Sequence, residues 1–434
     1  MEGLGDERVC RLHIVCVMHL PALHFRTLEP KERVKAALLG SWFFLTVATL
    51  WLLKSVRVAS LLAHLGARET PYVGLVSAAV VGLTVVFYSA AVSRLSRVEV
   101  VRATSAVFAV ALFAFWLAIR WVGPEIAGQR AFVWAIYVLV DVYTVVMIEL
   151  FWTYTADVVT QPEADRLYGV IGLGGIVGGA FGGGFVDLFA ERVGPVNLLG
   201  IAAVLVIGCA LLGSLTERVL SPPESVRVLI RKKDVPAAFE GIMEVKKSRY
   251  LLAIVGVVVA YEFAATLANY GVNVVFERAH LSEAQLAHLY GRLGWIASAT
   301  GIVAQVAIVP FLLPTKRIAL LLPPIAMLAS VVGVLVLPIL ATAFVMAAVD
   351  RGLNYSVQQA TRESLYVPLN RVQKYKAKAF IDMFVDRAAK ASASVLLVAL
   401  IALSNGSVRL SLAAACGAML LWIGSARRLG AYYG

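Results

Sequence analysis

The chain has 434 residues, of which 60% are hydrophobic and 15% are charged, and its formal net charge is +12 at neutral pH. Soluble domains are typically about 45–50% apolar and about 25% charged, so this composition excludes an ordinary water-soluble fold. The positive charge does not indicate nucleic-acid binding, because most surplus Lys and Arg residues lie in alternate short loops, where they act as topology signals.

Before the first long apolar stretch, residues 12–25 are apolar but too short to cross a membrane, and Pro21 interrupts them. No small-residue cleavage site follows them. We therefore interpret residues 1–30 as an N-terminal cytoplasmic or peripheral segment, with Met18 as an alternative start.

Apolar stretches of about 20 residues then recur along the whole chain, which is the length a helix needs to cross a bilayer. Lipid offers no partner for backbone N–H and C=O groups, so these stretches should be helical. We expect twelve spans, at residues 36–58, 71–93, 102–121, 130–155, 168–188, 196–214, 250–272, 288–311, 317–337, 341–360, 377–403 and 408–425. The predicted fold class is an all-α membrane protein with twelve transmembrane helices.

The loops between these spans differ in charge. The N-terminal flank and the loops after every second span are basic, and the longest loop, residues 215–249, is especially rich in Lys and Arg. The positive-inside rule places both termini and this loop in the cytoplasm, and we expect a multi-pass protein of a bacterial inner membrane. Two six-helix halves, residues 31–214 and 250–434, joined by a long cytoplasmic loop are typical of major-facilitator carriers.

The four cysteines form no CxxC pair and no metal-ligand spacing, and the six His residues form no plausible ligand set. No arrangement typical of a hydrolase or metalloenzyme stands out. We expect no cofactor, no bound metal and no enzyme activity, and we expect a monomer whose partners are membrane lipid and a small anionic solute.

Ionisable residues inside the expected spans are candidate site residues, because each costs roughly 2.5–3.5 kcal/mol on insertion scales. The first span carries Lys54 and Arg57, three residues apart and hence on one helix face. A pair of cations facing a central cavity suits a polyanion. The alternative is that both side chains extend from the end of the span to the membrane interface.

The fourth span carries the carboxylates Asp141 and Glu149, and the seventh carries Glu262, Asn269 and Tyr270. A carboxylate in a span can hold a proton, balance a basic residue or bind a cation. Ion pairing between helices is the structural alternative.

The tenth and eleventh spans are the most polar. In the tenth, Asp350, Asn354 and Gln358 recur at every fourth position, which places them on one helix face. A neighbouring face carries Arg351, Tyr355 and Arg362, with Glu363 following. The eleventh span opens with Asp382, Asp386, Arg387 and Lys390, of which Asp386 and Lys390 have the spacing of an ion pair. Such polar faces should point to a cavity or to another helix.

The fifth span contains eight glycines between residues 172 and 184. A dinucleotide fingerprint would need glycine at position 177, where Val177 stands, and no P-loop Lys follows. Small residues at three- and four-residue spacing allow helices to approach closely in lipid. We therefore expect tight packing, at a surface that slides during transport, rather than a phosphate cradle.

Several segments resemble the nucleotide-transporter family of plastids and intracellular bacteria, the ATP/ADP translocase type, which is distantly major-facilitator-like. The segment Leu-Glu-Pro-Lys-Glu at residues 28–32 is similar to the family's start, and the family's Arg/Lys pair, three residues apart, corresponds to Lys54 and Arg57. The segment at residues 66–72 is similar to the family's Gly-Ala-Glu segment before the second span.

Later segments extend the resemblance across both halves, over most of residues 28–400. Phe-Trp at residues 151–152, followed by residues 163–169, is similar to the family's Phe-Trp and Glu-Ala-Lys-Arg-Phe-Tyr. Residues 362–369 and 376–382, with Arg387, resemble Lys-Glu-x-x-Tyr-x-Pro-Leu, then Lys-x-Lys-Ala-x-Ile-Asp and Arg. The chain departs from the family at Val58, where an Asp is usual, and at Asn269, where an acidic residue is expected.

The resemblance implies a secondary transporter for nucleotides or related phosphorylated anions, working by alternating access. In this hypothesis Lys54, Arg57 and Arg351 bind phosphate groups, while Asp141 and Glu149 balance these charges in the empty site. Tyr270 or Tyr355 would stack a base. The other candidates for substrate contact are Asn269, Arg362, Glu363, Asp382, Arg387 and Lys390.

Two alternatives remain open at this point. One is a proton- or sodium-coupled carrier of the same fold for another solute, with Asp141, Glu149 or Glu262 as the coupling residue. The other is a membrane sensor or scaffold that transports nothing. Uptake that responds to an ion gradient, and not to a counter-loaded nucleotide, would favour the first.

Overall fold

The computed structural model describes residues 28–94, 96–220, 240–312, 315–366, 368–369, 377–378, 380–404 and 406–433, and all regular structure in these residues is helical. Most of the expected segment 1–30, and residues 221–239 of the expected central loop, lie outside the described residues. Eight of the described helices are long and apolar enough to cross a membrane. Each of the twelve expected spans contains helix, and several of these helices are longer than the sequence pattern indicates.

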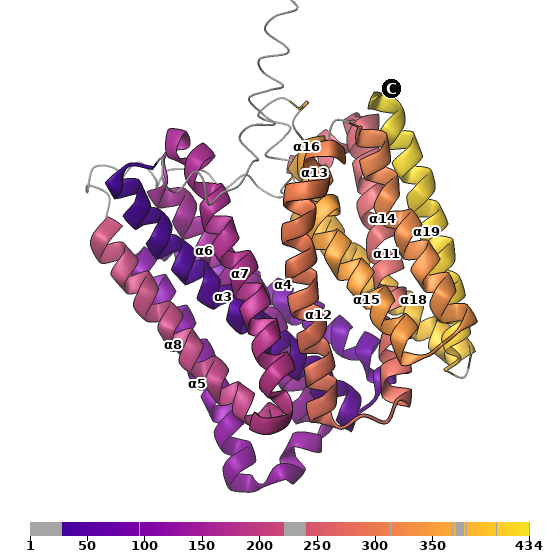
Figure 1. The fold of residues 1–434 in the computed structure, drawn as a ribbon, viewed down its shortest axis with the longest axis horizontal. Coiled ribbons are helices and arrows are strands. Elements are labelled where there is room, and N and C mark those ends of the chain that lie inside the picture. Colours follow the sequence, from indigo (N-terminus) through magenta and orange to yellow (C-terminus); the bar gives the residue numbers. More distant parts are fainter. Residues whose placement is uncertain are drawn as a thin grey trace, which may run out of the picture.

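The helices form two bundles (Figure 1). The first bundle contains α3 (Pro30–His64), α4 (Thr70–Arg94), α5 (Arg97–Val122), α6 (Arg130–Val158), α7 (Gln161–Val193) and α8 (Pro195–Leu220). After the short α10 (Glu240–Lys247), the second contains α11 (Arg249–Arg278), α12 (Glu283–Val303), α13 (Val309–Leu312), α14 (Lys316–Val336), α15 (Leu340–Leu353), α16 (Gln359–Leu365), α18 (Asp386–Leu403) and α19 (Val408–Gly430).

Three π-helical turns interrupt or begin helices of the second bundle: η3 (Ala304–Ile308) joins α12 to α13, η4 (Asn354–Gln358) joins α15 to α16, and η5 (Ile381–Val385) precedes α18. A π turn has more residues per turn than an α-helix, so it rotates the later residues of the same helix onto a different face. The expected common face of Asp350, Asn354 and Gln358 stays a prediction, because it assumed a regular α-helix and the π turn η4 begins at Asn354.

Local sequence explains how several helices begin and end. Ser96 and Glu99 form a reciprocal capping pair at the start of α5, with the Ser96 N–H donating to the Glu99 carboxylate at 2.8 Å. Gly66 follows α3 with φ +82°, and Gly194 follows α7 with the same φ. This left-handed conformation is strained for side chains other than glycine, so these residues allow sharp turns after long helices.

The glycines of α7 let it pack directly on α3, as the sequence predicts. A Cβ added at Gly174 would lie 2.4 Å from the Gly40 carbonyl oxygen, one at Gly178 2.3 Å from that of Phe44, and one at Gly182 2.2 Å from that of Ala48. Real Cβ atoms do not approach backbone oxygen this closely, so the four-residue spacing of small residues sets the distance between the two helix axes.

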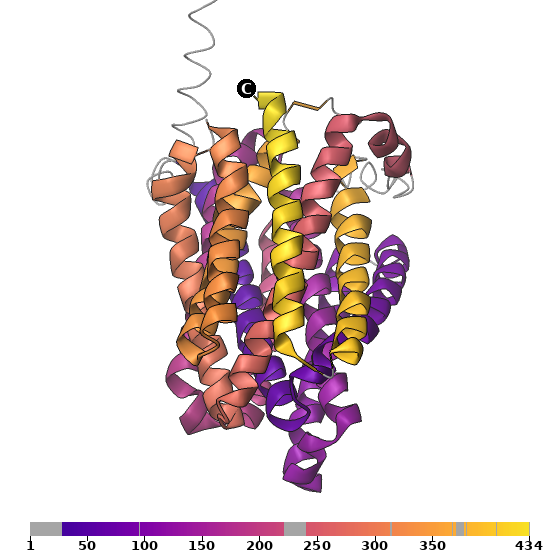
Figure 2. The same ribbon diagram turned by 90° about the vertical axis from the view of Figure 1, so that its right-hand side faces the viewer.

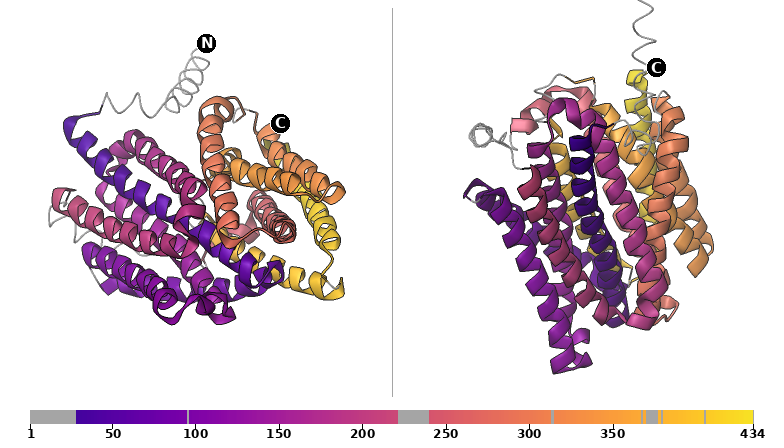
Figure 3. Two further views of the ribbon diagram at one scale, coloured as in Figure 1. Left: turned by 60° about the horizontal axis from the view of Figure 1, so that its bottom comes forward. Right: turned by 60° about the vertical axis from the view of Figure 1, so that its left-hand side comes forward.

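We call the end of the molecule where α3 begins and α19 ends the terminal face, and the opposite end the closed end. Figure 1 shows the bundles diverging toward the terminal face, where the C terminus lies, and converging toward the closed end. Figure 2 shows the second bundle from outside, with α19 near its centre. In both views of Figure 3 the bundles remain distinct, and α3 and α7 lie on the side of the first bundle that faces α12.

Candidate substrate site and gate between two helix bundles

Arg57 of α3 lies in a polar group within the first bundle. Its guanidinium forms an ion pair with Asp141 of α6, and the Ser77 hydroxyl of α4 donates a hydrogen bond to the same carboxylate. The guanidinium also lies over the ring of Tyr137, 4.3 Å from its centroid. Arg57 therefore binds another helix rather than extending to the membrane interface, as the alternative interpretation would require.

Lys54 lies one turn earlier on α3, at the contact between the two bundles. Its ammonium is 5.5 Å from the ring centroid of Trp51. A Cβ added at Gly294 of α12 would lie 2.8 Å from the Trp51 ring, and one at Gly179 of α7 would lie 2.9 Å from its Nε1. Lys54 thus stands beside an indole packed between helices of both bundles.

In the second bundle, Arg351 occupies a comparable position. Its guanidinium lies over the ring of Tyr290 of α12, 5.4 Å from the centroid, and its Nη1 is buried without a hydrogen-bond partner. The Tyr290 hydroxyl donates a 2.6 Å hydrogen bond to Asn273 of α11, whose amide lies 3.5 Å from the Thr70 hydroxyl of the first bundle. Buried donors usually find partners, so the orphaned Nη1 is available to a ligand or water.

Tyr290 connects the two arginine groups. The charges of Arg351 and Arg57 both act on its hydroxyl, as does Tyr137. The structure thus brings a guanidinium from each bundle toward one buried tyrosine. Tyr137 and Tyr290 were not singled out in the sequence, where a lone tyrosine in a span carries no signal of its position.

Asn269 and Asp350 form a second polar pair between α11 and α15. The Asn269 amide donates a 3.2 Å hydrogen bond to Asp350 Oδ2 and a 2.9 Å one to the Ala265 carbonyl. Asp350 is buried, and its Oδ1 has no hydrogen-bond partner. Where the resembled family has an acidic residue, this chain therefore has an amide that supports a buried carboxylate.

Two other predicted site residues lie apart from these groups. Glu149 is exposed on α6 and accepts a 3.5 Å hydrogen bond from Thr153. Tyr270 is fully buried, and Arg68 and Glu277 near the closed end act on its hydroxyl. The side chain of Tyr355 lies outside the described residues.

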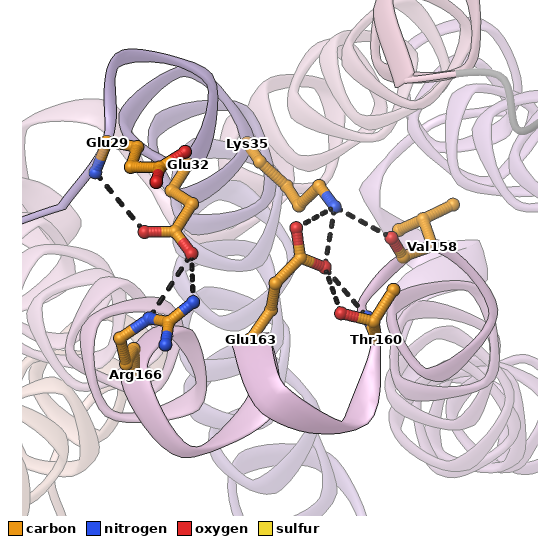
Figure 4. A network of polar contacts seen from close by, with 7 residues as sticks. All are labelled: Glu29, Glu32, Lys35, Val158, Thr160, Glu163 and Arg166. Atoms are coloured by element: carbon orange, nitrogen blue, oxygen red, sulfur yellow. Dashed lines mark hydrogen bonds and ion pairs between the residues drawn. The ribbon is translucent and has the colours of Figure 1, made fainter.

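At the terminal face the resembled motifs form a brace within each bundle. In the first (Figure 4), Lys35 donates to Glu163 at 2.8 Å and to the Val158 carbonyl at 3.0 Å, while Arg166 Nε donates to Glu32 at 3.2 Å. We call these residues the first brace. It connects the start of α3 to the junction of α6 and α7, and its residues Glu32, Glu163 and Arg166 come from the motifs at residues 28–32 and 163–169.

The second brace contains Arg362, Glu363, Lys378, Asp382 and Asp386. Arg362 forms an ion pair with Asp382 and lies 3.8 Å from Asp386, and Lys378 donates to Glu363 at 2.6 Å. The second brace thus connects α16 to the start of the eleventh span. The most specific motif of the sequence resemblance therefore supplies contacts between helices.

Deeper in the second bundle, Lys390 contacts two carboxylates. Its ammonium donates to Asp386 at 3.1 Å, as the spacing predicts, and lies 3.5 Å from Glu262 of α11. Arg387 is half-buried on the same helix, and its charge acts on Lys390.

A polar cluster joins the bundles at the closed end. Asp187 of α7 accepts hydrogen bonds from Arg292 at 3.1 Å and from Trp295 at 2.8 Å, and His288 lies 3.1 Å from it. We call these four residues the closed-end cluster. Beside it the helices touch through glycine, since a Cβ at Gly183 would lie 2.6 Å from the Trp295 nitrogen.

Further contacts seal the same end. His64 lies 3.3 Å from Glu283, and the Ala67 N–H donates to Glu277 at 3.0 Å. With the closed-end cluster, these contacts form a gate between the two bundles. The gate was not predicted, because it depends on pairing residues more than 100 positions apart.

An apolar groove of about 510 Å³ lies between α3, α7 and α8, and its lining includes Phe44, Leu45 and Val177. It lies away from Arg57 and Arg351 and contains no charged side chain. It is therefore unsuited to an anion.

Comparison with known proteins agrees with this arrangement. A family model described as TLC ATP/ADP transporter matches residues 120–318 and 285–433. The chain belongs to the TLC ATP/ADP transporter family. It is an integral, multi-pass membrane transporter and not an enzyme.

The curated relatives of this TLC family member are distant. An ADP,ATP carrier protein 1 of Chlamydia trachomatis is 25% identical over 362 residues, which cover 70% of this chain and 66% of the relative. A plastidic ATP/ADP-transporter of Solanum tuberosum is 25% identical over 357 residues, 71% of this chain and 55% of the relative. The match thus spans between about half and two thirds of these relatives.

Solved structures show that the fold is major-facilitator-like, as predicted. The POT family transporter PepTSo superposes with a TM-score of 0.64 at 10% identity, covering 91% of this chain and 98% of its own. A D-xylose–proton symporter gives 0.58 at 15% identity, covering 91% and 96%. At such identities the likeness concerns the fold and not the solute.

Proposed function

We propose that the protein exchanges nucleotides, or related phosphorylated anions, across a membrane by alternating access. The observation that carries the proposal is a pair of guanidiniums, one from each bundle: that of Arg57 lies over the Tyr137 ring and that of Arg351 over the Tyr290 ring. A ligand with several phosphate groups can engage both guanidiniums at once, and guanidinium binds phosphate oxygens through pairs of N–H donors.

The empty site neutralises its own charge. Asp141 forms an ion pair with Arg57, so this guanidinium is not a bare charge in the membrane. A phosphate group that binds Arg57 competes with Asp141 and gains the donors that this carboxylate releases. A ligand shifts a conformational equilibrium only through different affinities for its states, and contacts to both bundles supply that difference.

Lys54 adds a third cation beside the contact of Trp51 with Gly294, on the side of the molecule where the bundles meet. In this proposal Lys54 attracts the anion to the junction of the bundles. Tyr355 is the preferred candidate to stack a base, because Tyr270 is fully buried near the closed end. Arg387 and Lys390 adjust the charge around the anion.

The direction of opening follows from the basic residues of the terminal face. Lys31 and Arg33 lie in the first turn of α3, Lys246 and Lys247 end α10, and Arg428 lies in the last turn of α19. The positive-inside rule assigns this face to the cytoplasm of a bacterial plasma membrane. The conformation described is then the one that opens toward the cytoplasm, in a protein that works as a monomer.

Counter-exchange in proteoliposomes tests the proposal. Vesicles loaded with unlabelled ADP should take up labelled ATP, and empty vesicles should take up much less. Inorganic phosphate and nucleosides inside should fail to support the exchange at the same concentration. Uptake of ATP that ignores the internal nucleotide would contradict exchange, and the absence of any nucleotide uptake would contradict the substrate class.

A further inference from the structure

The buried carboxylate of Glu262 has no role in the gate or in the two arginine groups. It lies at the middle of α11 with 4% of its surface exposed, and Lys390 of α18 is 3.5 Å away. Lys390 is also shared with Asp386, to which it donates at 3.1 Å. The carboxylates of Glu262 and Asp386 therefore share this one ammonium.

The cations around Glu262 lie within ion-pair distance of other carboxylates as well. Arg362 of α16 forms an ion pair with Asp382 and lies 3.8 Å from Asp386, so Asp386 faces two cations. The charges that act on Glu262 are the attractive ones of Lys390 and Arg362 and the repulsive one of Asp386. Asp350 of α15 and Arg387 act on the same Lys390.

Two ionised carboxylates that share one ammonium leave excess negative charge at a buried position, and a proton on one of them removes it. Asp386 lies closer to Lys390 and also faces Arg362, so Glu262 is the carboxylate of the two with less positive charge beside it. We propose that Glu262 is a proton-binding site of this transporter, and that its proton is exchanged during the transport cycle.

The proton on Glu262 determines which groups the Lys390 ammonium contacts. The Lys390 side chain is 55% exposed and that of Glu262 is 5% exposed. When Glu262 is ionised, it and Asp386 both hold the ammonium. When a proton from one aqueous side binds Glu262, the ammonium keeps only Asp386 and can turn toward a bound anion. Release of this proton on the other side returns Lys390 to Glu262.

The coupling part of this inference rests on the proposed transport of phosphorylated anions. In each exchange cycle one proton moves with the entering anion and none with the leaving one, so the proton offsets one extra negative charge on the entering anion. At equilibrium, a gradient of one pH unit then corresponds to about a tenfold accumulation of the anion.

Infrared difference spectroscopy of the purified protein tests the proton site without any transport. Titration from acidic to alkaline buffer should remove a C=O stretch of a protonated carboxylic acid, and E262Q should lack this band. D386N, which removes one member of the pair, should shift the band. E125Q, which changes an exposed carboxylate in the turn before α6, should keep it. A band that persists unshifted in E262Q, or that disappears only in D350N, would overturn the proton site.

Uptake into proteoliposomes tests the coupling. In ADP-loaded vesicles, an inward proton gradient should increase the uptake of labelled ATP by the wild type and by E125Q, and E262Q should show the same uptake with and without the gradient. Wild-type uptake of ATP that ignores the gradient would overturn the coupling. If the wild type takes up no nucleotide, the proposed function fails, and the infrared result alone decides the proton site.

Discussion

Asp187 of α7 accepts a hydrogen bond of 3.1 Å from Arg292 of α12, and this contact joins the two bundles at the closed end. The same carboxylate accepts from the Trp295 indole at 2.8 Å. One side chain of the first bundle therefore satisfies several donors of the second, and the contact must break if the closed end is to open.

Asp187→Asn should favour opening of the closed end. It removes a charge-assisted contact, which is worth about 1.5–3 kcal/mol, so the equilibrium between the two conformations should shift about tenfold or more. A cysteine introduced at Ser77 should react with an impermeant thiol reagent from the closed-end side in this variant and be protected in the wild type. Glu191→Gln, an exposed carboxylate one turn further along α7, is the matched control. Equal labelling of both variants would contradict the gate.

Gly178→Ala should destabilise the first bundle. The new Cβ would lie 2.3 Å from the Phe44 carbonyl oxygen, so α7 must move away from α3 at a cost of about 1–3 kcal/mol. Gly184→Ala adds the same atom where nothing lies within 4 Å. Thermal unfolding in detergent should show a lower Tm for Gly178→Ala and an unchanged one for Gly184→Ala. Equal Tm values would show that the tight approach of these helices is unnecessary.

The sequence predicts the helices and the packing role of the glycines, because hydropathy and small-residue spacing are local patterns. It also indicates the ion pair of Asp386 and Lys390, which are one turn apart. The partner of Arg57 could not be assigned, since Asp141 and Glu149 are both carboxylates in the same span. The face drawn through Asp350, Asn354 and Gln358 assumed a regular helix, and no pattern in the sequence announced the π turn η4.

The motif residues show a further limit of the sequence. Arg362, Glu363 and Asp382 carry the strongest resemblance, and they were predicted to contact substrate; this stays a prediction. In the structure they contact one another and Lys378 at the terminal face. Tyr290, Asn273 and Asp187 carry no motif, yet they connect the bundles. Their positions follow only from the tertiary arrangement.

Arg57→Gln should impair nucleotide exchange. The change removes a cation and leaves the Asp141 carboxylate to repel the anion, so kcat/KM should fall by about tenfold to a hundredfold. Arg57→Gln combined with Asp141→Asn removes the repulsion as well, and it should recover part of the loss. Initial rates of ATP uptake into ADP-loaded vesicles measure both effects. If the Arg57→Gln variant has the wild-type kcat/KM, Arg57 does not belong to the substrate site.

The first brace should contribute less to the stability of the protein in acid. Burial of Glu163 opposes its ionisation, but the hydrogen bonds from Lys35 and Thr160 outweigh this, so its pKa lies below the ordinary 4.5. Stability from this group is therefore present above pH 4.5 and is lost as the pH falls through the lowered pKa. Glu163→Gln should flatten this part of the Tm–pH curve relative to Glu125→Gln. Parallel curves for the two variants would contradict the brace.

A structure of the protein in nanodiscs with bound ADP tests the central claim most directly. We expect density for the phosphate groups between the guanidiniums of Arg57 and Arg351, with Asp141 displaced from Arg57. Phosphate density elsewhere, with the Arg57–Asp141 ion pair intact, would contradict a substrate site shared by the two bundles.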